Sequence, residues 1–72
     1  MLEIDCDFND RDFDGAYIGL SIEGSPLSQW QGPQIHAGAR VLLVGYDRRS
    51  TVEAVLSHDF SPNRGGYVWR AL

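Results

Sequence analysis

The chain has 72 residues, of which 43% are hydrophobic and 22% are charged, and this balance predicts one globular domain rather than a disordered segment. A domain of this size removes only about 60% of its unfolded surface from water, so its margin of stability is small. Cys6 is the single cysteine, which excludes an internal disulfide as extra support and leaves association with a partner or a second copy.

The net charge of −4 is unevenly distributed. Residues 1–38 contain seven acidic residues and one arginine, whereas residues 39–72 contain five arginines and three acidic residues. Overall acidity argues against non-specific nucleic-acid binding, which depends on neutralising phosphates. No segment approaches the roughly 20 apolar residues of a membrane span, and an acidic N-terminus with one cysteine predicts a cytoplasmic protein. Because every basic residue is arginine, we associate the chain with a GC-rich bacterial genome.

The first two predicted elements are strands. Residues 2–8 alternate apolar and acidic side chains, a pattern typical of a strand with one buried and one solvated face. Residues 16–23 alternate in the same way, so we expect a second strand paired with the first.

The segment between these strands raises the question of a metal site. Asp10, Asp12 and Asp14 precede Gly15 at the spacing of a calcium-binding loop. The twelfth position of such a loop is Ser21, which cannot supply the bidentate carboxylate. We therefore interpret the segment as a solvated acidic hairpin turn, with weak calcium binding as a lesser hypothesis, and we expect no cofactor.

The remaining elements follow in order. Residues 24–38 contain glycine and proline breaks and predict a long loop anchored by Trp30 and Ile35. The predicted elements after it are a central strand at 39–46, a turn at 47–50, a strand at 51–60, a turn at 61–66 and a strand at 67–72. Residues 51–60 also carry apolar residues at helical spacing, so an α+β fold with a helix there stays open.

This order of elements resembles small barrels of the SH3 and KOW type. The resemblance rests on residues 37–44, the turn at 47–50, residues 51–56 and the aromatic closing strand at 67–72. It implies an all-β, five-stranded antiparallel barrel spanning residues 1–72. Such barrels serve many functions, so the resemblance implies no particular activity.

We expect a binding module rather than an enzyme. His36, His58 and Cys6 lack the close pairing of a zinc site, and no nucleophile–base pattern or phosphate-binding loop is present. Large aromatic and arginine side chains dominate binding hot spots. The candidate binding residues are Trp30, Tyr46, Arg48, Arg49, Arg64, Tyr67 and Trp69.

Two functions follow from these residues. The first is protein–protein interaction or self-association, including a homodimer in which the acidic half of one copy meets the arginines of the other. The second is nucleic-acid binding, in which aromatic rings stack on bases and the C-terminal arginines contact phosphates. The arginines in question are Arg40, Arg48, Arg49, Arg64 and Arg70. A weaker hypothesis is that the acidic stripe mimics a nucleic acid.

Overall fold

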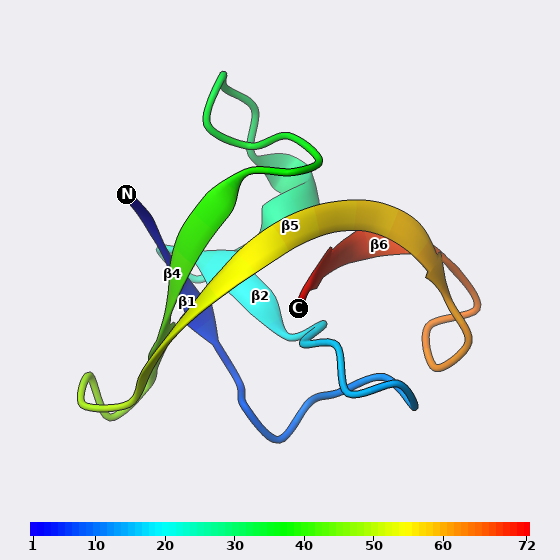
Figure 1. Cartoon of the computed structure of the whole chain (residues 1–72), viewed down its shortest axis with the longest axis horizontal. Helices are drawn as coiled ribbons and strands as arrows, with labels where there is room; N and C mark the ends of the chain where they lie inside the picture. Colours follow the sequence, from blue (N-terminus) through cyan, green and yellow to red (C-terminus); the bar gives the residue numbers. More distant parts are fainter.

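Six strands and one short 3-10 helix make up the regular structure of residues 1–72 in the computed structural model. The sheet order is β3-β2-β1-β4-β5-β6, and the sheet curls into a half-barrel (Figure 1). The all-β prediction is confirmed, and the helical alternative for residues 51–60 is wrong because that segment is strand. The elements are β1 (Leu2–Cys6), β2 (Leu20–Ile22), β3 (Ser25–Pro26), η1 (Leu27–Gln29), β4 (Arg40–Gly45), β5 (Thr51–Ser61) and β6 (Gly66–Ala71).

The pairing of β1 corrects part of the prediction. β1 pairs antiparallel with β2 as expected, with Asp5 opposite Ser21 and Cys6 opposite Leu20. Its other edge pairs with β4 in parallel, so the expected wholly antiparallel barrel is wrong. The physical reason is the long segment between β3 and β4, which returns the chain to the end of the sheet where β1 begins. β4 is central, as predicted.

The strand count also differs from the five that were expected. Glu23 and Gly24 have φ values of 52° and 80°, and two consecutive positive values form the tight turn that suits a two-residue hairpin. This turn folds β3 back onto β2 and adds a sixth strand. Trp30 anchors the following loop, as predicted, because its Nε1 donates a hydrogen bond to the Ile22 carbonyl at 3.1 Å.

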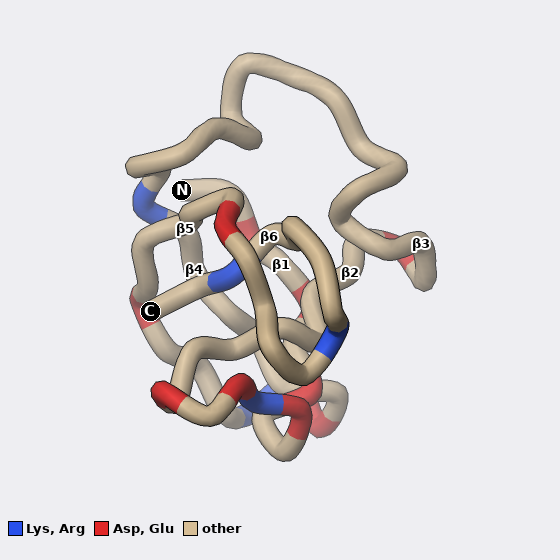
Figure 2. The backbone as a smooth tube through the Cα atoms, turned by 90° about the vertical axis from the view of Figure 1, so that its right-hand side faces the viewer, with Lys and Arg blue, Asp and Glu red and all other residues tan.

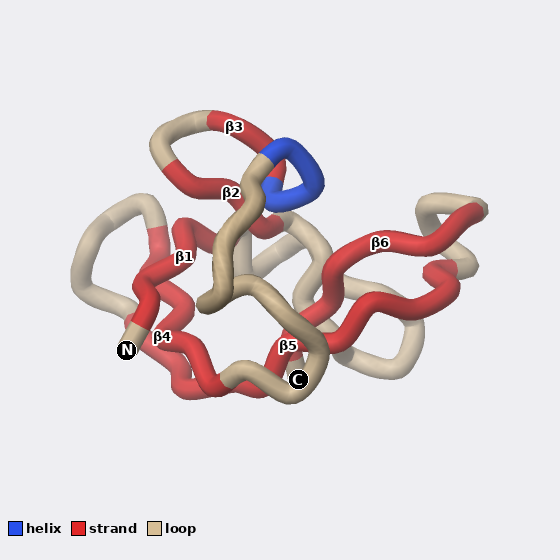
Figure 3. The backbone as a smooth tube through the Cα atoms, turned by 90° about the horizontal axis from the view of Figure 1, so that it is seen from above, coloured by secondary structure: helices blue, strands red, loops and turns tan.

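β5 gives the sheet its curl. Its first five residues pair with β4 and its last six pair with β6, so one long strand belongs to two faces of the half-barrel. Seen from above, the β5–β6 hairpin extends away from the other strands (Figure 3).

The core lies inside the curl. The alternating apolar faces of the strands supply it, as the sequence predicted, and burial raises the pKa of the Cys6 thiol to about 11. None of the helical structure is long and apolar enough to cross a membrane. The buried cluster consists of Ile4, Cys6, Leu20, Leu27, Ala39, Val41, Leu43, Ala54, Leu56 and Ala71.

The first and last parts of the chain meet at one point. The Tyr17 N–H donates to the Ala71 carbonyl at 2.8 Å, and the Ala71 N–H donates to the Tyr17 carbonyl at 3.0 Å. This bridge joins β6 to the segment that leads into β2. The strand expected over residues 16–23 is shorter in the structure, because only Leu20–Ile22 belongs to the sheet. The Ile18 N–H donates to the Asp10 carbonyl and not to a neighbouring strand.

Candidate binding groove

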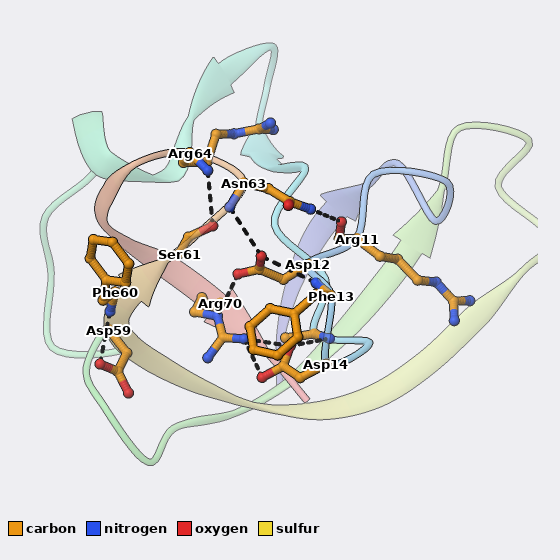
Figure 4. Close-up of polar contacts among 11 residues, drawn as sticks. Arg11, Asp12, Phe13, Asp14, Asp59, Phe60, Ser61, Asn63, Arg64 and Arg70 are labelled. Carbon is orange, nitrogen blue, oxygen red and sulfur yellow. Dashed lines mark hydrogen bonds and ion pairs between the residues drawn. The ribbon is translucent and has the colours of Figure 1, made fainter.

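The acidic segment is a structural clamp rather than the solvated turn that the sequence predicted. Asp12 is only 4% exposed, and its Oδ1 accepts hydrogen bonds from the N–H groups of Phe13 at 3.2 Å and Asn63 at 3.4 Å. The Asn63 side chain also donates to the Arg11 carbonyl at 2.9 Å. Residues 11–14 are thus packed against the β5–β6 turn (Figure 4), and the carboxylate is buried because it holds these segments together.

Arg70 supplies the positive charge at this clamp. Its Nε lies 3.3 Å from Oδ2 of Asp12, and neither atom has another partner, so each compensates the burial of the other. Its Nη2 forms a charged hydrogen bond with Asp14. The hydrogen bond from Arg70, followed by one from the Ala16 N–H, lowers the pKa of Asp14, and the same contact raises the pKa of Arg70.

Two further arginines are paired within the chain. Arg64 pairs with Asp10, and Arg48 pairs with Asp5. The carboxylates of the candidate calcium loop, Asp10, Asp12 and Asp14, are therefore each engaged by a guanidinium group. No cluster of three or more His, Cys, Asp or Glu residues is arranged to hold a metal ion. Figure 2 shows several acidic residues close together at the lower end of the molecule, with arginine among them.

The β4–β5 turn carries the remaining candidate arginines. Asp47 accepts hydrogen bonds from the Arg49 and Ser50 N–H groups at 2.9 and 3.1 Å, and these bonds lower its pKa. Arg48 has a positive φ of 62°, which the turn imposes. Arg49 is exposed and lies at this turn, on a different part of the molecule from the aromatic strand β6.

A row of aromatic rings lines one face of the β5–β6 hairpin. His58 lies opposite Trp69, with ring centres 4.9 Å apart, and Phe60 lies opposite Tyr67 at 6.1 Å. These residues continue the face that begins with the buried pair Leu56 and Ala71. Tyr67 is 69% exposed and Phe60 is 49% exposed, whereas Trp69 is half-buried against the core. The row is the part of the apolar face that extends beyond the core.

Next to this row lies a groove of about 770 Å³, between β6 and the segment that contains β2, β3 and η1. Of the predicted binding residues, it brings together Tyr46, Arg64, Tyr67 and Trp69. It does not include Trp30, which supports the loop, nor Arg48 and Arg49, although Arg48 pairs with the lining residue Asp5. The size suits a ligand segment rather than a single water or ion.

Two members of the aromatic row, His58 and Phe60, are not among the binding residues predicted from the sequence. His58 was weighed there only as a possible zinc ligand. The signal was available in the alternation of residues 54, 56, 58 and 60 together with the short turn at 61–66. Pairing the two strands across that turn places both side chains beside Tyr67 and Trp69.

Comparison with protein-family models, curated proteins and solved structures finds no significant match for the chain. Its function must therefore be inferred from the site. The groove offers aromatic faces, serine hydroxyls, main-chain groups and charges that are already paired within the chain. Such a surface suits non-covalent binding of a largely uncharged segment.

Proposed function

We propose that this chain is a non-catalytic binding module that holds a segment of another protein in the groove beside β6. The observation that carries the proposal is the exposed aromatic row on the β5–β6 hairpin. Exposed tyrosine and tryptophan at the edge of a groove are the residues that most often dominate protein-binding energy. Tyr67 and Phe60 lie beyond the small core and keep much of their surface in water, so they contribute little to the stability of the fold.

Two features of the architecture support the resemblance to SH3-like small barrels. β5 is long, strongly curved and shared between two faces, and the bridge between Tyr17 and Ala71 brings the first and last parts of the chain together. The parallel pairing of β1 with β4 and the sixth strand depart from the expected arrangement. The proposed function therefore rests on the groove and not on the architecture.

Nucleic-acid binding is the second candidate, and it has weaker support. Of the five arginines that it would use, Arg48, Arg64 and Arg70 are each paired with a carboxylate of the same chain. Only Arg40 and Arg49 have no such partner. Contact with phosphates would require breaking these pairs in a chain whose net charge is −4. Measurable binding of a single-stranded oligonucleotide at about 50 mM salt would favour this candidate over the first.

The same ion pairs weaken the case for self-association through charge. The acidic half was expected to meet the arginines of a second copy, whereas Asp5, Asp10, Asp12 and Asp14 pair with arginines of their own chain. Support for a homodimer would have to come from the aromatic row instead. Light scattering of the pure protein at low and high salt distinguishes a dimer held by charge from one held by apolar contact.

The test of the proposed function compares two exposed aromatic residues. Wild-type protein, Tyr67→Ala and Phe13→Ser are immobilised and used to capture proteins from native cell extract. Phe13 is the matched control because its ring is exposed but does not line the groove. We expect partners that bind wild type and Phe13→Ser and are lost with Tyr67→Ala. Capture of nothing, or equal capture by the three proteins, would contradict the proposal.

A further inference from the structure

The edge of β6 that faces the groove has unpaired main-chain groups. Leu72 exchanges two hydrogen bonds with Val55, at 3.0 and 3.1 Å, while Ala71 exchanges two with Tyr17 on the opposite side. Successive residues of a strand direct their N–H and C=O groups to opposite sides. Trp69 and Tyr67 therefore direct theirs to the same side as Ala71, away from β5.

The chain supplies no strand to pair with these two residues. After Tyr17 the backbone turns away from β6: Ile18 N–H donates to the Asp10 carbonyl at 3.1 Å, and the Gly19 carbonyl accepts from Asp7 N–H at 2.9 Å. β2 then pairs with β1 and β3. The space that opens between β6 and residues 18–21 is the groove itself, because Ile18, Gly19, Leu20 and Ser21 line it together with Val68 and Trp69.

We propose that an extended peptide segment of another protein binds in this groove as an added strand along β6, with its backbone bonded to Tyr67 and Trp69. This inference rests on the proposed function and specifies its mode of binding. Strand addition to an open edge obtains affinity from main-chain hydrogen bonds and specificity from alternate side chains. The aromatic row would contact every second side chain of the peptide, so those positions should be apolar.

The surroundings of the groove favour a single peptide segment over other occupants. η1 contacts β6 and bounds the groove, and a single extended segment is a narrower occupant than the whole hairpin of a second copy. The lining charges Arg64 and Asp5 are both paired within the chain. A phosphate backbone would find no free cation there, whereas an uncharged peptide backbone needs none.

The experiment uses a displayed library of random linear octapeptides as the probe. Peptides selected on the wild-type protein are synthesised, and each backbone N–H is replaced by N-methyl in turn. If the peptide adds as a strand, N-methylation weakens binding about tenfold at alternate residues and little at the residues between them. Amide exchange of Tyr67 and Trp69 should slow when the peptide binds, while Val68 and Arg70 should change little.

The outcomes separate this inference from the function on which it rests. Selected peptides that depend on Tyr67 but show no alternation on N-methylation would overturn strand addition and leave groove binding intact. Failure to select any peptide that Tyr67→Ala weakens and Phe13→Ser does not would also overturn strand addition. The proposed function would then be judged separately by the capture experiment. A dimer in which the Tyr67 and Trp69 amides are already protected would overturn strand addition by a peptide, because the edge of β6 would then be paired with a second copy.

Discussion

Two pairs of residues on the same face of the β5–β6 hairpin have opposite environments. Leu56 and Ala71, at its base, are 1% and 0% exposed, whereas Phe60 and Tyr67, near its tip, are about half to two-thirds exposed. Both pairs belong to the same antiparallel register, separated by His58 and Trp69. The alternation of apolar residues thus continues past the point where the core ends.

One periodic pattern of apolar residues therefore runs through two environments, the core and the exposed tip of the hairpin. At the base, apolar side chains are removed from water and stabilise the fold. At the tip, Phe60 and Tyr67 contact each other but extend past the core and stay partly in water, so their apolar surface is available to the proposed partner. Substitutions along the hairpin should separate stability from binding.

The largest effect is expected at the base of the hairpin. Leu56→Ala leaves a cavity in a fully packed site and should lower the free energy of unfolding by about 2–5 kcal/mol. Val55→Ala, the adjacent residue on the opposite and partly exposed face, should cost less than about 1 kcal/mol and serves as the control. Urea unfolding measures both, and equal losses would show that the base is not the core.

The second largest loss of stability is expected at the clamp, in which Asp12 contacts Arg70 and Asn63. Arg70→Met leaves the buried carboxylate of Asp12 without its compensating charge and should cost about 3 kcal/mol. Arg64→Met removes a more exposed ion pair with Asp10 and should cost less than about 1 kcal/mol. If the two variants unfold at the same urea concentration, the clamp has no special role.

Acid should weaken the protein through Asp14 and Asp47. The pKa values of both carboxyls are lowered in the folded state, so their contribution is complete above the unfolded value of about 3.9 and is lost as pH falls through the lower folded value. Urea unfolding from pH 7 down to about pH 2 should show this loss of stability, most of it below about pH 4. The free energy of unfolding should fall less steeply with decreasing pH in Arg70→Met and in Asp47→Asn. An unchanged slope in both variants would contradict the assignment of the acid sensitivity to Asp14 and Asp47.

The smallest effect on stability is expected at the tip. Tyr67→Ala removes a largely exposed ring and should change the free energy of unfolding by less than about 1 kcal/mol, while it abolishes binding in the groove. Thermal unfolding and peptide binding measured on the same preparation check the two halves of this prediction. A large loss of stability would place Tyr67 with the core residues instead.

Much of the fold could be predicted from the sequence because strand alternation is a local signal. The alternation predicted strands over residues 2–8 and 51–60, and the structure has strands over Leu2–Cys6 and Thr51–Ser61. In the second segment the apolar residues also fitted helical spacing, so the sequence left a helix open there. The parallel pairing of β1 with β4 could not be predicted, because it depends on how the irregular segment before β4 returns across the sheet. The third strand was missed because it contains only two residues and Glu23 adopts an uncommon positive φ.

The candidate site was predictable only in part. Tyr67, Trp69, Tyr46 and Arg64 were identified by residue type, and the structure places them around one groove. The burial of Asp12 was not foreseen, because its local sequence, between Arg11 and Phe13 in an acidic segment, gives no sign of an arginine 58 positions away. Its ion pair depends on tertiary structure, which a period-two pattern does not encode.

Amide hydrogen exchange of the free protein tests most directly the claim that the hairpin has a closed base and an open edge. We expect slow exchange for the Ala71 amide, which donates to Tyr17, and for the Val68 and Arg70 amides, which face β5. The Tyr67 and Trp69 amides, which face the groove, should exchange much faster than these three. Equal protection of these five amides would show that the edge is already closed and that no open edge faces the groove.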